Sequence, residues 1–499
     1  MKPRSSDHVT ILAGASQNVL GLLIAGVATL GAQVLISRTL GEEAFGIVTV
    51  LTQAAFVLSF ATRAGMDMAV IRTVAIAAGA SREERIRAMV TRAAVIAGGV
   101  SLLAALAILL AAEPITRAFS LDPSTSRWAV QAAAVGLPFL AVTNVWLGAT
   151  RGLKIMRYTL YVFWAGQPVV WIALMLLGWR ISETPWMSVL AYSISWLWAA
   201  GASWGVFRRE SGRWERAPLE PGVSGRLMRY AGPRAPAALF SQLVFWADLF
   251  VLAHFASDRS IGIYSGVLRT GQMVVLFLTS VNLMFSPFVA DLYSRGEIDC
   301  LGRLFKSLTR WTLAATVPLF IVLAVAPGEV LDLFGESYRE GRTALLILLG
   351  GQLVNIATGS AGFVLIMVGR TGWDLAVYAG SLTLNLALAV WLCPRYGIEG
   401  AAFANAATFA CSNVARIVLV KRFVGIHPYD GGFARLLAPA AVGAAAGWVV
   451  HSLVPGSSVG LVLTGAAVVV AYGIAYAGVG LTSEERSGAS ELLARRQAR

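Results

Sequence analysis

Charged residues and cysteines are scarce in this sequence. Asp, Glu, Lys and Arg make up 13% of its 499 residues, whereas a typical soluble domain has about 25%. So few charges cannot cover the surface of a soluble protein of this length. The three cysteines, Cys300, Cys393 and Cys411, show no paired spacing, which argues against disulfides and against a zinc site. An ordinary soluble enzyme, a disordered protein and a disulfide-rich scaffold are therefore excluded.

Signatures of soluble catalysis are also scarce. The sequence has no His-Glu-x-x-His zinc-protease motif. It also has no P-loop, the motif that binds the phosphates of ATP, so we do not expect it to hydrolyse ATP itself. A Gly-x-Ser-x-Gly match at Gly456–Gly460 has no strand before it, and the context of a nucleophile elbow is missing. The four histidines are scattered. We therefore expect no catalytic residue, no metal site and no cofactor, and we do not expect an enzyme.

Apolar residues, in contrast, are abundant and occur in long runs. They make up 57% of the chain, and runs near 20 residues, the length that crosses a bilayer core, recur along it. The sequence predicts an all-α, polytopic membrane protein with about fourteen transmembrane helices. The predicted spans are residues 11–38, 44–64, 88–112, 127–149, 158–179, 186–207, 226–255, 261–286, 307–326, 342–367, 374–393, 400–422, 433–451 and 458–480.

The basic residues predict the orientation of these spans. With a cytoplasmic N-terminus, 30 of the 40 Lys and Arg lie in or next to the loops and tails on the cytoplasmic side, and eight on the other side. Cytoplasmic loops of membrane proteins carry such an excess, so both termini are expected in the cytoplasm. The net charge of +13 is then explained by orientation and by anionic lipids, and we expect membrane lipids but no nucleic acid as partners.

The longest basic connector, Phe207–Arg229, separates six predicted spans from eight. A weak internal repeat supports a boundary there, because Gly46-Ile47 and Gly262-Ile263 each open the second span of their half. Two halves of six spans have the same orientation, as in parallel-repeat transporters. The predicted organisation is an N-terminal lobe at 1–207, a cytoplasmic connector at 208–225, a C-terminal lobe at 226–423, and two peripheral spans with a cytoplasmic tail at 424–499.

Two charged residues are expected deep in the membrane. Asp248 lies about eight residues before the outer end of the seventh span, and Arg269 about eight residues after the outer start of the eighth. Because the two spans form a hairpin, both side chains fall at a similar depth. They are either a structural ion pair or a functional pair, in which Arg269 contacts an anionic substrate and Asp248 takes a proton.

A second group of charges follows the second span. Arg63, Asp67 and Arg72 form either a cluster at the membrane interface or a cationic cytoplasmic mouth that binds a phosphorylated headgroup. Arg234, at the start of the seventh span, is a candidate for the same mouth. Amides within the spans, among them Gln242 and Asn282, indicate a hydrated polar interior.

Four segments, in order along the chain, carry patterns typical of one family. They are LISRTLGEEAFGIVTVL (Leu35–Leu51), FWADLFVLAHFASDRSIGIYSGVLR (Phe245–Arg269), LFGESYREG (Leu333–Gly341) and PRYGIEGAAFANA (Pro394–Ala406). Through them the chain resembles the polysaccharide-exporting, oligosaccharide-lipid flippase branch of the multidrug/oligosaccharidyl-lipid/polysaccharide exporter superfamily. The resemblance implies a two-lobed bundle that works by alternating access. Its substrate would be a lipid-linked oligosaccharide, usually on undecaprenyl diphosphate, moved from the inner to the outer leaflet of the bacterial inner membrane.

On this overall interpretation of the sequence, the polar residues within and beside the spans have expected roles. Arg269, Arg63 and Arg234 would contact the anionic headgroup, Asp248 would be a partner or a proton site, and Asn282 and Gln242 would bind sugar hydroxyls. The expected partners are the lipid-linked oligosaccharide and membrane lipids, with a polysaccharide polymerase and glycosyltransferases as further candidates.

Two alternatives remain open on the sequence. A cation-coupled multidrug exporter of the same superfamily would favour acidic residues in its cavity, and Asp248 is the best deep acid. A membrane glycosyltransferase or polymerase would need a catalytic carboxylate. The outer loop with Glu329, Asp332 and Glu336 is the only acidic candidate, and it is short.

Overall fold

A computed structural model describes residues 5–79, 84–118, 123–153, 155, 157–211, 222, 225, 227–228, 231 and 234–481 of the chain. Side chains are described from Gly26 onward, except at scattered positions that include Arg234. All regular structure within these ranges is helical, with no strand. The all-α class is therefore confirmed.

The chain divides into two compact units. Unit 1 consists of Met1–Arg269 and Tyr378–Asn405, and unit 2 of Thr270–Val377 and Ala406–Arg499. The units are defined by which residues contact one another, whereas the lobes expected at 1–207 and 226–423 are defined by the basic connector and a weak internal repeat. The two lobes remain a prediction.

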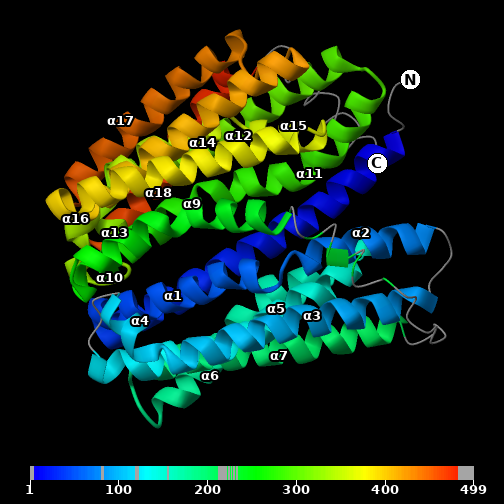
Figure 1. Ribbon diagram of the computed structural model, residues 1–499. Helices are drawn as coiled ribbons and strands as arrows, with labels where there is room; N and C mark the ends of the chain where they lie inside the picture. The colour runs from blue at the N-terminus through cyan, green and yellow to red at the C-terminus, as the bar shows by residue number, and fades with distance from the viewer. Residues whose placement is uncertain are drawn as a thin grey trace. The chain divides into compact units, whose positions relative to one another are not determined.

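Unit 1 is built from helices of the first half of the chain and two helices that follow. They are α1 (Ser5–Thr62), α2 (Met66–Gly79), α3 (Glu84–Leu110), α4 (Ala112–Ala118), α5 (Pro123–Gly152), η1 (Thr159–Gly166), α6 (Gln167–Trp179), α7 (Pro185–Ser211), α9 (Arg234–Phe255) and α10 (Asp258–Met273) as far as Arg269. The middle of α16 (Thr371–Val424) completes the unit. Within it, α5 packs against both α3 and α7, and the three lie side by side (Figure 1).

The helix α2 lies between the second and third predicted spans, 44–64 and 88–112. It has 14 residues, too few to cross a bilayer. Its apolar side, with Met66, Val70 and Val74, is buried in a core shared with α3 and α5. Gly148 and Gly152 of α5 allow this close packing, because a methyl group on either would lie within 3 Å of a backbone carbonyl oxygen of α2.

Unit 2 contains the remaining helices. They are α11 (Val275–Ser294), α12 (Ile298–Val325), α13 (Pro327–Leu331), η2 (Glu336–Gly341), α14 (Arg342–Ala357), α15 (Ala361–Met367), the C-terminal part of α16, η3 (Gly431–Leu436), α17 (Leu437–Leu453), α18 (Ser458–Ala475) and η4 (Tyr476–Gly480). The last two predicted spans form the hairpin of α17 and α18, which packs against α12. Gly443 and Gly447 of α17 lie against α18, and the Tyr472 hydroxyl of α18 donates to the Ala314 carbonyl of α12 at 2.9 Å.

Within the described ranges, each predicted span coincides with one helix or with two consecutive helices. Among the described residues, nine helices are long and apolar enough to cross a membrane, or ten if the pair Glu336–Ala357 and Ala361–Met367, bent by 44°, is one span. Two of these helices, α1 and α16, each hold two predicted spans joined at a glycine with non-helical dihedrals, Gly41 (φ 84°) and Gly397 (φ 54°). Glycine adopts such positive φ angles without steric cost. The polytopic architecture is confirmed, and fourteen spans are consistent with it.

Candidate functional site

A buried carboxylate lies where three helices of unit 1 meet. Asp248 of α9 is fully buried and accepts a hydrogen bond from the Tyr264 hydroxyl of α10. Its other oxygen accepts one from the Asn405 amide of α16 at 3.1 Å. Both carboxylate oxygens are therefore satisfied, as a buried charge requires. The carboxylate joins α9, α10 and α16.

Arg269 does not pair with this carboxylate. Within the described residues no ion pair joins Asp248 and Arg269, because Tyr264 and Asn405 already occupy the Asp248 oxygens. The Arg269 guanidinium instead stacks on the indole of Trp246 of α9, 4.8 Å from the ring centroid. The structural ion pair that the sequence allowed is thus replaced by a cation–π contact.

The Arg269 guanidinium has unused hydrogen-bond donors. Its Nε and Nη2 atoms are buried and have no hydrogen-bond partner in the part of the chain that the structure describes. A buried donor without a partner costs about 1–3 kcal/mol, and more when it is charged. An anionic group that supplied two acceptor oxygens would remove this cost, since guanidinium binds phosphate in a bidentate manner. Arg269 is therefore the strongest candidate for anion contact.

Arg63 lies in the turn between α1 and α2 and is only 3% exposed. Its guanidinium stacks on Phe60 at 3.7 Å and pairs with Asp67 at 3.3 Å. Its Nη2 atom has no hydrogen-bond partner among the described residues. Arg72 on α2, in contrast, is exposed. The exposed Arg72 fits a cluster at the membrane interface, whereas the buried Arg63 does not. The Asp67 carboxylate largely neutralises the charge of Arg63.

The start of α9 lies next to this turn. A methyl group on Gly65 would be 2.7 Å from the carbonyl oxygen of Ala231, three residues before Arg234. Arg234 begins α9, but its side chain lies outside the described residues. The backbone that carries Arg234 is thus close to the Arg63 turn, as a shared mouth requires.

The two amide candidates lie in different units. Gln242 is partly buried on α9 in unit 1, six residues before Asp248. Asn282 is partly buried on α11 in unit 2. Their roles in sugar binding remain predictions.

Tyr264, Asn405 and Trp246 were not predicted as site residues. All three lie inside segments with a family pattern, since Trp246 and Tyr264 belong to Phe245–Arg269 and Asn405 is the second-last residue of Pro394–Ala406. The pattern was visible, but the contact of Asn405 with a carboxylate 157 residues away was not.

Two acidic residues of the outer loop that was the catalytic alternative contact basic side chains. Asp332 pairs with Arg339 at 2.7 Å, and Glu329 lies 3.9 Å from His451. Within the described residues no three His, Cys, Asp or Glu side chains come together as a group that could hold a metal ion.

The two glycines of the internal repeat lie in one close contact of unit 1. A methyl group on Gly46 of α1 would overlap the Asp258 carbonyl and the Gly262 backbone of α10, and one on Gly262 would overlap the Glu42 carbonyl. Beside them, Arg259 donates to Glu42 at 3.2 Å. The turn after the first predicted span and the turn before the eighth are thus held together by backbone contact and an ion pair.

The Asp248 cluster predicts a measurable stability difference. Replacing Tyr264 with phenylalanine removes a donor to a carboxylate, and we expect a loss of about 1.5–3 kcal/mol in the free energy of unfolding. The matched variant Tyr472→Phe removes a bond to a neutral carbonyl, so about 0.5–1.5 kcal/mol is expected. Chemical unfolding of the purified protein in detergent measures both. An equal or smaller loss at Tyr264 would contradict the arrangement.

Comparisons with known proteins agree with this architecture. Residues 11–292 match the family described as "Polysaccharide biosynthesis protein", and residues 233–391 match the MatE family. Two Haloferax volcanii proteins are similar in sequence. The chain is 24% identical over 201 residues to the "Probable low-salt glycan biosynthesis flippase Agl15", covering 40% of this chain and 43% of that protein. It is 24% identical over 191 residues to the "Probable flippase AglR", covering 37% and 39%.

The chain therefore spans about two fifths of the length of the curated relatives it matches. Two solved structures share its fold over greater lengths. "Lipid II flippase MurJ, inward closed conformation" has a TM-score of 0.69 at 12% identity, covering 96% of this chain and 99% of that one. An inward-facing multidrug resistance MATE family transporter of the MOP superfamily has a TM-score of 0.65 at 13% identity, covering 82% and 98%. At such low identities the likeness concerns the fold alone.

Proposed function

The chain belongs to the polysaccharide biosynthesis protein family of the multidrug/oligosaccharidyl-lipid/polysaccharide exporter superfamily, and from this premise we propose that it is a flippase. Its substrate is a lipid-linked oligosaccharide of the undecaprenyl-diphosphate type. The protein moves this lipid from the inner to the outer leaflet of the bacterial inner membrane by alternating access, with both termini in the cytoplasm. It is a transporter rather than an enzyme. A polysaccharide polymerase and glycosyltransferases are partners in the same pathway.

One observation carries the proposal, namely the buried Arg269 guanidinium with two donors that have no hydrogen-bond partner in the described structure. In this mechanism Arg269 binds the diphosphate during transfer, while Arg63 and Arg234 guide it at the cytoplasmic mouth. Asp248 fixes α9, α10 and α16 and is the proton site. Gln242 and Asn282 bind sugar hydroxyls.

The membrane potential is sufficient to drive the proposed direction. A diphosphate carries about two negative charges, and each gains about 2.3 kcal/mol per 100 mV on moving outward from a negative cytoplasm. About 4–5 kcal/mol per 100 mV is therefore available without an ion gradient. Proton binding at Asp248 would serve to reset the empty protein.

The direct test is reconstitution of the purified full chain into liposomes that contain a fluorescent lipid-linked oligosaccharide. We expect the labelled lipid to reach the outer leaflet faster than in protein-free liposomes, and faster when the interior is negative. Absence of movement at either potential would contradict the flippase proposal. Export of a cationic dye instead would favour the multidrug alternative, which the MatE match supports but the buried, unpaired Arg269 cation disfavours.

A further inference from the structure

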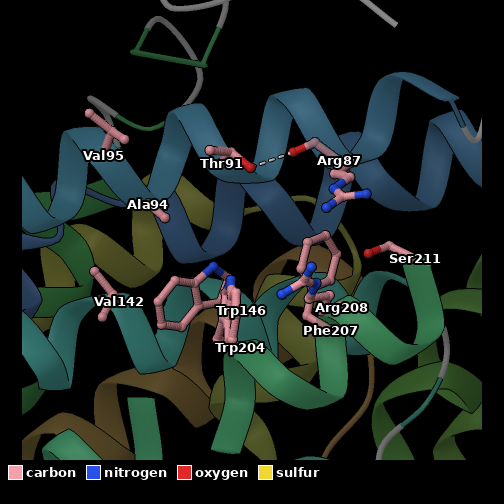
Figure 2. Close-up of a pocket in the computed structure, with 10 residues that line it drawn as sticks. All are labelled: Arg87, Thr91, Ala94, Val95, Val142, Trp146, Trp204, Phe207, Arg208 and Ser211. Carbon is pink, nitrogen blue, oxygen red and sulfur yellow. Dashed lines mark hydrogen bonds between the residues drawn. The ribbon is translucent and has the colours of Figure 1, made fainter. Parts of the chain in front are cut away.

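A cavity of about 260 Å³ lies between α3, α5 and α7 of unit 1. Figure 2 shows Arg87 and Thr91 of α3 on one side and Arg208 of α7 on the other. Trp146 of α5 and Trp204 of α7 lie on the same side as Arg208 and face α3. None of these residues is among those proposed to contact the transported lipid.

The charge of this cavity is positive and is not neutralised by the described residues. The Arg87 and Arg208 guanidinium groups both point toward the space between the helices (Figure 2). Within the described part of the chain neither pairs with a carboxylate, and the contact of Arg208 is a cation–π interaction with Trp204 at 5.1 Å. Two guanidinium groups that face one hollow are complementary to a phosphate.

The cavity lies at one end of a candidate membrane span, Ile86–Leu110. Along α3 the side chains beyond the cavity are exposed and apolar, with Leu103 at 70% and Leu110 at 90%. Arg87 lies in the first turn of α3 and Arg208 in the last turn of α7, so both belong to the end of unit 1 that the positive-inside rule assigns to the cytoplasm. Trp204, which is 46% exposed, has the amphipathic character of an interfacial residue.

We propose that this cavity is a binding site for the phosphate headgroup of an anionic phospholipid of the cytoplasmic leaflet. Arg87 and Arg208 donate to the phosphate oxygens, and the first acyl carbons pack against the apolar wall formed by Val95 and Val142. Basic pockets between transmembrane helices on the cytoplasmic side have this specificity. The site is separate from the transport function, and the lipid is a bound component of the N-terminal half.

Native mass spectrometry of the full chain in detergent tests the site, with phosphatidylglycerol as probe and phosphatidylcholine as the zwitterionic comparison. We expect tighter binding of phosphatidylglycerol. The double variant Arg87→Gln/Arg208→Gln should weaken that binding by about tenfold or more, the usual effect of losing charge-assisted hydrogen bonds. The matched control Arg92→Gln/Arg209→Gln changes the same charge on the same two helices outside the cavity and should leave the affinity unchanged. Equal losses in both double variants would overturn the proposal.

A second variant keeps both charges. Thr91 is exposed on α3 and lines the cavity, so Thr91→Trp should fill it and weaken phosphatidylglycerol binding while retaining both arginines. Added phosphatidylglycerol should raise the Tm of the wild-type chain, since a ligand of the folded state stabilises it, but not that of Thr91→Trp. Unaltered binding in this variant, or equal affinity for the two phospholipids, would overturn the proposal. So would a double variant that loses affinity for lipid-linked oligosaccharide but not for phosphatidylglycerol.

Discussion

Replacing Arg269 with glutamine is expected to lower lipid transport about tenfold or more while leaving the Tm unchanged or raised. The charge of Arg269 is stacked on Trp246 but has two buried donors without a hydrogen-bond partner in the described structure. Removing the charge loses a cation–π contact, which lowers the stability of the folded protein. It also removes the cost of burying an unpaired charge, which raises that stability, so the two effects oppose each other. A residue retained for stability would show the reverse pattern. The liposome assay and thermal unfolding in detergent measure the two quantities.

Two further variants sharpen this prediction. Arg269→Lys keeps the charge but loses the planar fork that binds phosphate through two hydrogen bonds, so transport should be intermediate. Arg117→Gln removes an exposed arginine that is ion-paired with Glu113 on α4, and it should affect neither transport nor Tm. Normal transport by Arg269→Gln, or a large fall in its Tm, would remove Arg269 from the proposed site.

The membrane architecture was predictable because hydropathy and glycine are local signals. The spans joined at Gly41 and Gly397 were separable from the sequence, since each break combines a glycine with charged residues between apolar runs. The helix α2 was not predicted, because 14 residues are too short for a span and its burial depends on Gly148 and Gly152 of α5. Tertiary packing, rather than any local pattern, decides the location of such a helix.

The sequence was enough to predict that Asp248 and Arg269 lie deep in the membrane, but not which side chains they contact. Hairpin geometry was enough to suggest that Asp248 and Arg269 are deep charges on neighbouring helices. Their pairing depended on Asn405, which comes from a distant helix and competes for the carboxylate. No spacing in the sequence encodes that competition, and the Gly-x-Tyr pattern of Phe245–Arg269 marks Tyr264 without showing that its hydroxyl contacts Asp248.

Replacing Gly262 with alanine is expected to separate two turns that are in contact. One is the turn after the first predicted span, at Glu42, and the other is the turn before α10. The added methyl group would overlap the Glu42 carbonyl, and backbone cannot yield as a flexible side chain does. Overpacking of this kind costs about 1–3 kcal/mol, which shifts an equilibrium between closed and open turns about 5- to 150-fold toward the open state. A transporter that alternates between two states would then be held in one of them, and the transport rate should fall about tenfold or more.

Cysteine labelling in a background without native cysteines measures the opening. Thr49 lies one turn beyond Gly46 on α1 and is 1% exposed, so Thr49→Cys should react slowly with an impermeant maleimide while the turns are closed. Adding Gly262→Ala should increase this rate from the outer side of the membrane, whereas the matched change Gly201→Ala should not, because a methyl group there meets no atom within 4 Å. Equal labelling in the two variants would mean that the Gly46–Gly262 contact is static packing. An increase from the cytoplasmic side would instead reverse the orientation that the basic residues predict.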